Sequence, residues 1–345
     1  MENMQQLTFI GPEKFEWREV AGPAISEGKQ AIVKPLAVTR CDLDLYIATG
    51  LFPMEGPFAF GHEIAGVVTD VGDSVNNFTP GDRVIVPFQI NCGSCDMCLK
   101  GFSNACMSVP AFSAYGLAPS SGTDWGGGFS DFVKIPFADA MLKKIPDHIN
   151  LPAAAALSDN AVDGFRTVKD ALTQYPGADI LVVGGLAQSV GLFAVQAAIA
   201  LGTGRVVYAD YDDTRLAAAK GLGAQVRKTV FKDGTMSPEQ FSVVVEASGV
   251  PGALQFALHS TRPCGVCTSV SAGMESEATI PLRAMYMKGI TYNVSRVHAR
   301  GTLDDALECH RCHQLKPEAI ISKTINFDDA AEAMTDPTIK PVFVR

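Results

Sequence analysis

The sequence has no long apolar segment, no run of positive charge and no internal repeat. Its longest apolar stretch, around 190–201, is interrupted by Gln196 and is shorter than the roughly 20 residues of a membrane-spanning helix. No basic, apolar leader opens the chain, so we expect a soluble cytoplasmic protein whose nine cysteines are metal ligands or buried thiols. A net charge of −9 argues against nucleic acid as a partner, and we expect no membrane partner.

The chain is long enough for two domains. Its first half consists of short β-branched runs separated by Gly and Pro, whereas the second half places the apolar run 179–183, a glycine-containing turn and the apolar segment 190–201 in succession. Strands that alternate with helices are typical of a doubly wound parallel sheet. We therefore predict an α/β protein in which a mostly-β domain, 1–156 and 290–345, is interrupted by a nucleotide-binding domain, 157–289.

Four cysteines follow one another at metal-ligand spacing, namely Cys92, Cys95, Cys98 and Cys106. Two-residue gaps allow a tight loop to wrap one ion, and four thiolates complete a tetrahedral zinc shell. Such a shell leaves no position for a substrate, so this lobe predicts a structural zinc site. An iron–sulfur cluster is the alternative that four cysteines leave open.

Three further residues are candidate ligands of a second metal. Cys41 lies upstream of the tripeptide Gly61-His62-Glu63, and Asp159 lies close to the start of the nucleotide-binding half. Taken singly, each is a weak signal, because an isolated His or Cys is more often a buried structural residue. They become informative only in combination with the other motifs of the chain.

In combination with the cysteine lobe and the nucleotide fold, these motifs resemble the zinc-containing medium-chain dehydrogenase/reductase (alcohol dehydrogenase) family. The motifs that carry the resemblance are spread over the chain: 39–44, Gly61-His62-Glu63-x2-Gly66, 80–84, the cysteine lobe and 127–129. The resemblance implies a GroES-like catalytic domain with an inserted Rossmann domain. It also implies two zinc ions per subunit and a homo-oligomer, either a dimer or a tetramer.

The resemblance assigns Cys41, His62 and Asp159 to the catalytic zinc and makes Glu63 an exchangeable or neighbouring ligand. Three protein ligands leave one position open for water or substrate. Zn²⁺ at such a position polarises an alcohol oxygen and lowers the pKa of what it binds. A hydride then passes between the alcohol carbon and a nicotinamide, and the reverse reaction reduces an aldehyde or ketone.

The expected cofactor turn departs from the usual G-x-G-x-x-G pattern. Counting back from its last glycine puts Leu186 and Gln188 where the first two glycines normally stand. The residues assigned to it are Gly184, Gly185, Leu186, Gln188, Ser189, Val190 and Gly191. Asp210 follows at ~20 residues, where a carboxylate binds the ribose hydroxyls and disfavours a 2′-phosphate. This favours NAD over NADP, although Arg215 matches a family position near the ribose and weakens the preference.

Other positions depart from the family pattern or touch the substrate. Leu43 and Tyr46 stand where the family places its proton relay, so bound water with Asp42, Asp44 or Tyr46 is the expected replacement. Leu43 and Phe88 are expected to line the substrate pocket, and a phenyl ring there favours apolar alcohols. Separately, Asp163 replaces a threonine that commonly supports the nicotinamide.

We therefore predict an NAD-dependent zinc alcohol dehydrogenase acting on a small alcohol or carbonyl compound. A polyol or sugar dehydrogenase and a zinc-free quinone or enoyl reductase of the same fold are alternatives. A non-catalytic redox sensor that uses Cys264-x2-Cys267 and Cys309-x2-Cys312 is the least favoured. The run Cys309–His313 also matches a haem-attachment pattern, which we reject because the segment reads as an ordinary helix.

Overall fold

The computed structural model describes residues 3–232, 234–250, 252–270, 277–313 and 315–345, without the side chain of His313. The chain forms two compact units. The first comprises Met1–Asp159, His298–Asp304 and Pro317–Arg345, and the second comprises Asn160–Val297 and Asp305–Lys316. Within the described ranges, no helix is both long and apolar enough to cross a bilayer.

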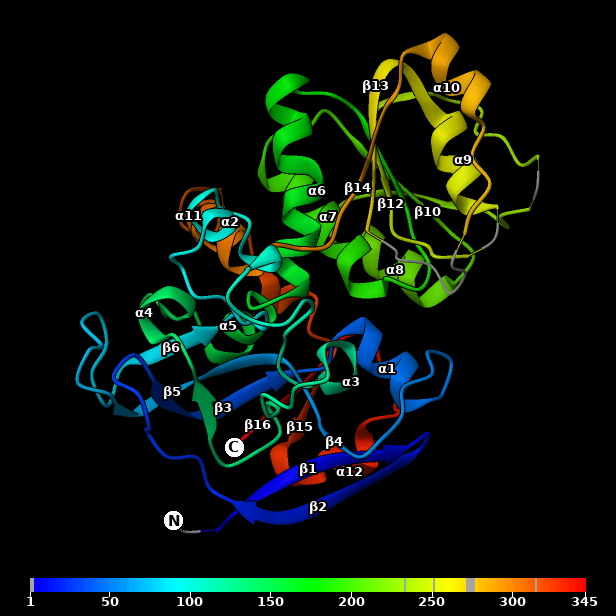
Figure 1. The fold of residues 1–345 in the computed structure, drawn as a ribbon. Helices are drawn as coiled ribbons and strands as arrows, with labels where there is room; N and C mark the ends of the chain where they lie inside the picture. The colour runs from blue at the N-terminus through cyan, green and yellow to red at the C-terminus, as the bar shows by residue number, and fades with distance from the viewer. Residues whose placement is uncertain (1–2, 233, 251, 271–276, 314) are drawn as a thin grey trace. The chain divides into compact units, whose positions relative to one another are not determined.

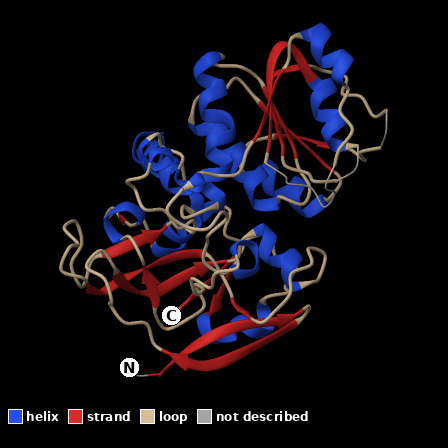
Figure 2. Ribbon diagram, viewed as in Figure 1, coloured by secondary structure: helices blue, strands red, loops and turns tan. Residues whose placement is uncertain are grey.

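The first unit is built mainly from strands, as the red arrows of Figure 2 show. Its larger sheet has the order β15-β16-β3-β5-β6-β8, and β7 pairs with β3. These strands are β3 (Ala31–Thr39), β5 (Glu63–Val71), β6 (Arg83–Val86), β7 (Val133–Ile135), β8 (Lys143–Lys144), β15 (Lys323–Asn326) and β16 (Pro341–Val344). A smaller sheet has the order β2-β1-β4, from β1 (Asn3–Gly11), β2 (Lys14–Ala21) and β4 (Phe58–Ala59).

Short helices connect the strands of the first unit. They are α1 (Asp42–Ala48), α2 (Asp96–Leu99), α3 (Ala118–Ser121), α4 (Ala138–Met141), α5 (Leu151–Ala156), α12 (Ala330–Ala333) and the 3-10 turns η1 (Ser103–Ala105), η2 (Pro317–Ala319) and η3 (Phe327–Asp329). Alternate side chains of β5 and β6 enter a core that includes Ile64, Val68, Val84 and Val86. This sheet is the rigid support of the first unit.

The second unit is a parallel sheet of order β11-β10-β9-β12-β13-β14. Its strands are β9 (Ile180–Val183), β10 (Val206–Asp210), β11 (Gln225–Lys228), β12 (Phe241–Glu246), β13 (Thr261–Ser269) and β14 (Thr291–Val294). The helices are α6 (Asn160–Gln174), α7 (Gln188–Ala200), α8 (Asp213–Gly221), α9 (Ala253–Ser260) and α10 (Leu282–Lys288). Figure 1 shows α6 and α7 on one side of the strands and α9 and α10 on the other. This strand order is that of a dinucleotide-binding fold.

The observed division of the chain differs from the expected domains, 1–156 with 290–345 and 157–289, in the C-terminal part. β14 belongs to the second unit because it pairs in parallel with β13. Helix α11 (Ala299–His313) contributes to both units. Its C-terminal half joins the second unit, where Gln196 and Lys316 exchange two hydrogen bonds of 2.7 and 3.1 Å. Sheet pairing and this amide clamp, rather than sequence texture, set the boundary.

The C-terminal segment of the first unit is held by a buried arginine. The Arg40 guanidinium donates to the carbonyl oxygens of Met334 at 3.0 Å and Asp336 at 2.5 Å, and also to that of Thr338. Arg40 is 1% exposed, so these carbonyls and the positive charge satisfy one another away from water.

We expect Arg40→Met to lower the free energy of unfolding by ~2–4 kcal/mol, because it leaves buried carbonyl oxygens without their charged donor. Thermal unfolding of the zinc-loaded protein measures the loss. Arg18→Met is the control, because the Arg18 side chain makes an exposed ion pair with Glu16, and its loss should cost under ~1 kcal/mol. Equal shifts for the two variants would show that the Arg40 contacts contribute nothing special.

Candidate metal centre and cofactor site

The end of β3 delivers Cys41 to the start of α1. Cys41 is the N-cap of this helix, and its backbone N–H donates to Asp44 Oδ2 at 3.1 Å. Asp44 therefore closes a capping box, which satisfies a backbone donor at the helix start. The cap fixes both side chains at one buried place, and Cys41 and Asp44 are 6% and 0% exposed.

His62 stands directly before β5, after a glycine whose conformation few other residues adopt. Gly61 has a φ of +85°, and a Cβ added to it would lie 2.3 Å from the ring of Phe129. Only glycine fits this backbone and this contact. The tight approach places the His62 side chain in the interior, where it is buried.

Asp159 follows α5 and is tied to β5 by its neighbour. The Ile64 N–H donates to Ser158 Oγ at 3.0 Å, and Ser158 Oγ donates to the carbonyl oxygen of Ala155 at 2.6 Å. One serine thus connects the end of α5 to the strand that begins immediately after His62. This connection brings Asp159 next to His62 although the two are far apart in sequence.

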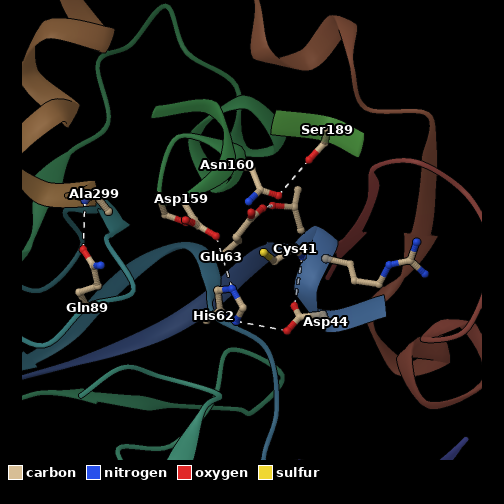
Figure 3. Close-up of polar contacts among 12 residues, drawn as sticks. Cys41, Asp44, His62, Glu63, Gln89, Asp159, Asn160, Ser189 and Ala299 are labelled. Carbon is tan, nitrogen blue, oxygen red and sulfur yellow. Dashed lines mark hydrogen bonds and ion pairs between the residues drawn. The ribbon is translucent and has the colours of Figure 1, made fainter. Parts of the chain in front are cut away.

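The three side chains converge in the first unit. Cys41 Sγ, a His62 nitrogen and an Asp159 carboxylate oxygen lie within 4.8 Å of one another, and all three residues are buried. Figure 3 shows His62 between Asp159 on one side and Asp44 on the other. A thiol, an imidazole and a carboxylate are ligands that Zn²⁺ accepts, and three of them leave a position for an exogenous oxygen. The donor set fits a catalytic zinc ion.

The two ring nitrogens of His62 have separate partners. Nε2 lies 3.4 Å from Asp159 Oδ2, whereas Nδ1 lies 3.3 Å from Asp44 Oδ1. Metal-binding histidines commonly direct the opposite N–H to a carboxylate, which fixes the ring and raises its basicity. Asp44 therefore orients His62, so that Nε2 is the nitrogen available to a metal.

The charges around this cluster favour a cation. Burial lowers the pKa of His62, but Asp44, Cys41 and Asp159 outweigh it and raise that pKa well above its usual value. Burial and the nearby Asp159 charge raise the pKa of the Cys41 thiol. Without an ion, the group holds protons, and a divalent cation would replace them.

Glu63 stands apart from the three ligands. Its carboxylate pairs with Lys340 Nζ at 2.6 Å and accepts a hydrogen bond from Thr39. Lys340 also donates to the carbonyl oxygen of Arg40 at 3.1 Å. Burial raises the pKa of Glu63 to about 7, although Lys340 opposes the shift. The structure therefore gives Glu63 a neighbouring position held by Lys340.

The four lobe cysteines also gather at one point. The Sγ atoms of Cys92, Cys95, Cys98 and Cys106 lie within 4.8 Å of one another. Backbone N–H groups donate to these sulfurs, for example Cys95 N to Cys92 Sγ at 3.3 Å. Burial raises the pKa of Cys92, but hydrogen-bond donors that include Ser108 and Ser94 outweigh burial and lower this pKa to about 5. Burial raises the pKa of Cys106 instead, so the fit to a closed zinc site rests on the four converging sulfurs.

The expected nucleotide turn connects β9 to α7 in the second unit. A Cβ on Gly185 would lie 2.6 Å from the Ser248 carbonyl oxygen, so the turn packs closely on the chain beyond β12. The Leu186 N–H donates to that oxygen at 2.6 Å, and the Ala187 N–H donates to the Ala247 oxygen. These amides brace the turn, and α7 begins directly after it with Gln188, Ser189 and Val190. The N-terminus of a helix is a place that favours a phosphate.

Asp210 is the last residue of β10 and is fully buried. Arg215 grips it with two hydrogen bonds, Nε to Oδ2 and Nη2 to Oδ1, both 2.8 Å long. The sequence placed both residues near the ribose, and the structure adds that they form one ion pair. The Arg215 guanidinium also lies 4.9 Å from the centre of the Tyr211 ring.

The remaining predicted residues have distinct surroundings. The Phe88 ring centre lies 5.2 Å from that of His62, so a phenyl ring lies beside one of the candidate metal ligands. Tyr46 is buried on α1, and Leu43 is half-buried. Asp163 accepts a 2.6 Å hydrogen bond from Arg166.

Sequence reasoning missed Ser158 and Lys340, because their partners lie across the fold and nothing local marks them.

All nine cysteines are free thiols. Cys264 is exposed and Cys267 is buried on β13, while Cys309 is buried and Cys312 exposed on α11. The exposed Cys312 Sγ lies 3.0 Å from a carboxylate oxygen of Glu308 in the same helix. Neither pair belongs to a metal-ligand cluster of the described residues.

Comparison with known proteins agrees with this geometry. The family described as "Alcohol dehydrogenase GroES-like domain" matches residues 27–147, and "Zinc-binding dehydrogenase" matches residues 189–310. Sorbitol dehydrogenase of Bacillus subtilis (strain 168) is 32% identical, over 83% of this chain and 79% of that protein. D-xylulose reductase A of Aspergillus oryzae is 27% identical, over 95% and 92%. The structure of alcohol dehydrogenase TADH from Thermus sp. ATN1 superposes with a TM-score of 0.87 at 26% identity, covering 99% of both chains.

The chain belongs to the zinc-containing medium-chain dehydrogenase/reductase family. The sequence prediction of a GroES-like domain with a Rossmann domain is confirmed. The protein is a zinc-dependent oxidoreductase of the alcohol and polyol dehydrogenase class, and its substrates are small molecules.

We expect Asp44→Asn to weaken metal binding at the Cys41 cluster by ~10–100-fold, because His62 loses the carboxylate that orients its ring. Competition with a chromophoric chelator measures the affinity. Asp213→Asn serves as the control, since Asp213 is exposed and pairs with Lys228 in the second unit. Superimposable chelator curves for the two variants would contradict the orienting role.

Proposed function

We propose that the protein is an NAD-dependent zinc alcohol dehydrogenase with two zinc ions per subunit. The observation that carries the proposal is the buried convergence of Cys41, His62 and Asp159. Zinc held by these residues would supply a Lewis acid for an alcohol oxygen, and NAD would supply the hydride acceptor. The four lobe cysteines would hold the second, structural zinc ion.

The side chains around the candidate metal site determine which substrates suit it. Asp44 holds the His62 ring in orientation, while Lys340 keeps the Glu63 carboxylate paired. Phe88 places an apolar ring beside the imidazole, which suits the alkyl part of an alcohol. The preference is therefore for alcohols with an apolar group beside the hydroxyl, and polyols are the second substrate class, supported by the sorbitol dehydrogenase relative.

The proposed use of NAD is supported by the buried carboxylate of Asp210 at the end of β10. Carboxylates at this position accept hydrogen bonds from both ribose hydroxyls. Steric evidence supports the turn itself, because a Cβ on Gly184 would lie 2.5 Å from Asp210 Oδ2. The first turn of α7 offers its dipole to the pyrophosphate.

An NAD-coupled absorbance screen over alcohols, polyols and their carbonyl products tests the function directly. We expect reduction of NAD with apolar primary or secondary alcohols, and elemental analysis should give two zinc ions per subunit. Cys41→Ala should abolish turnover and retain one zinc ion, whereas Cys106→Ala should lose the other ion and lower the unfolding temperature. Full turnover in a zinc-free preparation would instead indicate the quinone or enoyl reductase alternative.

We further propose that Tyr46 takes part in moving the alcohol proton. Leu43 cannot carry a proton, and Asp44 is engaged by His62 and the Cys41 N–H. Asp42 and Tyr46 then remain as candidates on α1, and Tyr46 carries the hydroxyl that a relay would use.

We expect Tyr46→Phe to lower kcat for alcohol oxidation ~100-fold near neutral pH. Part of the activity should return at higher pH, where hydroxide takes the proton, while zinc content stays unchanged. The control is Tyr175→Phe, which removes a hydroxyl from the second unit. Identical pH–rate profiles for the parent and Tyr46→Phe would exclude Tyr46.

A homo-oligomer, either a dimer or a tetramer, is proposed for the assembly. Exposed apolar side chains on α10 and β14 support it, namely Leu282, Tyr286, Met287 and Val294. The cytoplasmic location stays a prediction of the sequence.

A further inference from the structure

The last three residues of strand β10 direct two side chains to the same face of the strand. Tyr208 and Asp210 are separated by one residue, so they project to one side, and both are fully buried. The Tyr208 hydroxyl donates a 2.9 Å hydrogen bond to Asp210 Oδ2. The carboxylate that is proposed to bind the ribose thus accepts a hydrogen bond from the Tyr208 phenol.

The same hydroxyl lies beneath the nucleotide turn. A Cβ on Gly184 would lie 2.1 Å from Tyr208 Oη, and one on Gly191 would lie 3.8 Å from it. The phenol therefore reaches the two glycines that open and close the turn. The backbone between them is supported by the side chain that also contacts Asp210.

Each oxygen of Asp210 has a fixed set of donors. Oδ1 accepts from the N–H groups of Tyr211 at 2.6 Å and Asp212 at 3.0 Å. Arg215 donates to both oxygens, and Tyr208 donates to Oδ2. Because the Arg215 charge compensates the carboxylate, repulsion alone is a weak barrier to a 2′-phosphate. Selection of a free ribose diol must then depend on how the carboxylate is oriented.

A diol and a phosphate use this site differently. A ribose diol donates hydrogen bonds to a carboxylate and needs its oxygens in place, whereas a 2′-phosphate is an acceptor that binds a cation such as Arg215. Tyr208 contacts the carboxylate, and a change in its hydroxyl should therefore affect the two cofactors unequally.

We propose that Tyr208 is a positioning residue for the adenosine ribose, which acts through Asp210 to favour a free 2′-hydroxyl over a 2′-phosphate. This inference rests on the proposed use of a nicotinamide cofactor. It identifies a residue two positions before the ribose carboxylate as a determinant of cofactor choice.

Tyr208→Phe tests the proposal, because it keeps the ring under the turn and removes only the hydroxyl. We expect the Kd of NADH to rise about tenfold, as for the loss of a hydrogen bond to a charged group, while that of NADPH changes less than about twofold. Nucleotide fluorescence titrations of the zinc-loaded protein, without alcohol, measure both constants. Tyr175→Phe is the matched control, since its hydroxyl donates to the Cys264 carbonyl oxygen in the same unit.

Equal weakening of both cofactors would assign Tyr208 a packing role only, and unchanged NADH binding would refute the proposal outright. Should Tyr208→Phe fail to fold, Asp210→Glu displaces the carboxylate from the Tyr208 hydroxyl and must give the same selective loss of NADH. Failure of the parent protein to bind either nucleotide would refute the proposed function instead, so the two failures are distinguishable.

Discussion

A thiol, an imidazole and a carboxylate, all withdrawn from water, impose one physical requirement on the first unit. Desolvated groups of this kind keep their ionised forms only beside an opposite charge. Cys41 and Asp159 would bring two negative charges to a point where His62 brings a neutral donor. A divalent cation meets that requirement, and for this reason the metal and the folded site depend on each other.

The surrounding structure holds each ligand by a second contact. Asp44 closes the cap that carries Cys41 and also faces His62, and Ser158 connects the end of α5 to β5 just before Asp159. Lys340 approaches Glu63 from the C-terminal segment, which Arg40 in turn holds through backbone carbonyls. The geometry of the three candidate ligands thus depends on contacts that span most of the first unit. A change at any of these contacts should alter the affinity for a metal ion.

The sequence predicts features that depend on neighbouring residues better than features that depend on contacts between distant segments. The cysteine lobe, the glycine before His62 and the alternation of strands and helices in 179–201 are local patterns, so they predicted the fold and the candidate ligands. The partnerships of Ser158 with Ile64 and of Lys340 with Glu63 join distant segments and follow no spacing rule. The division between the two units after residue 290 could not be predicted either, because it depends on the pairing of β14 with β13 and on the hydrogen bonds between Gln196 and Lys316.

The phenol of Tyr208 shows why the irregular nucleotide turn can still form. A regular turn relies on glycines to approach the pyrophosphate, whereas here Leu186 and Gln188 occupy two of those places. The Leu186 amide instead braces the turn against the Ser248 carbonyl oxygen, and Tyr208 fills the space below Gly184. Since the same hydroxyl also donates to Asp210, the support of the turn and the orientation of the proposed ribose carboxylate depend on one side chain. Departure from the glycine pattern and the proposed cofactor selectivity would therefore have a common physical origin.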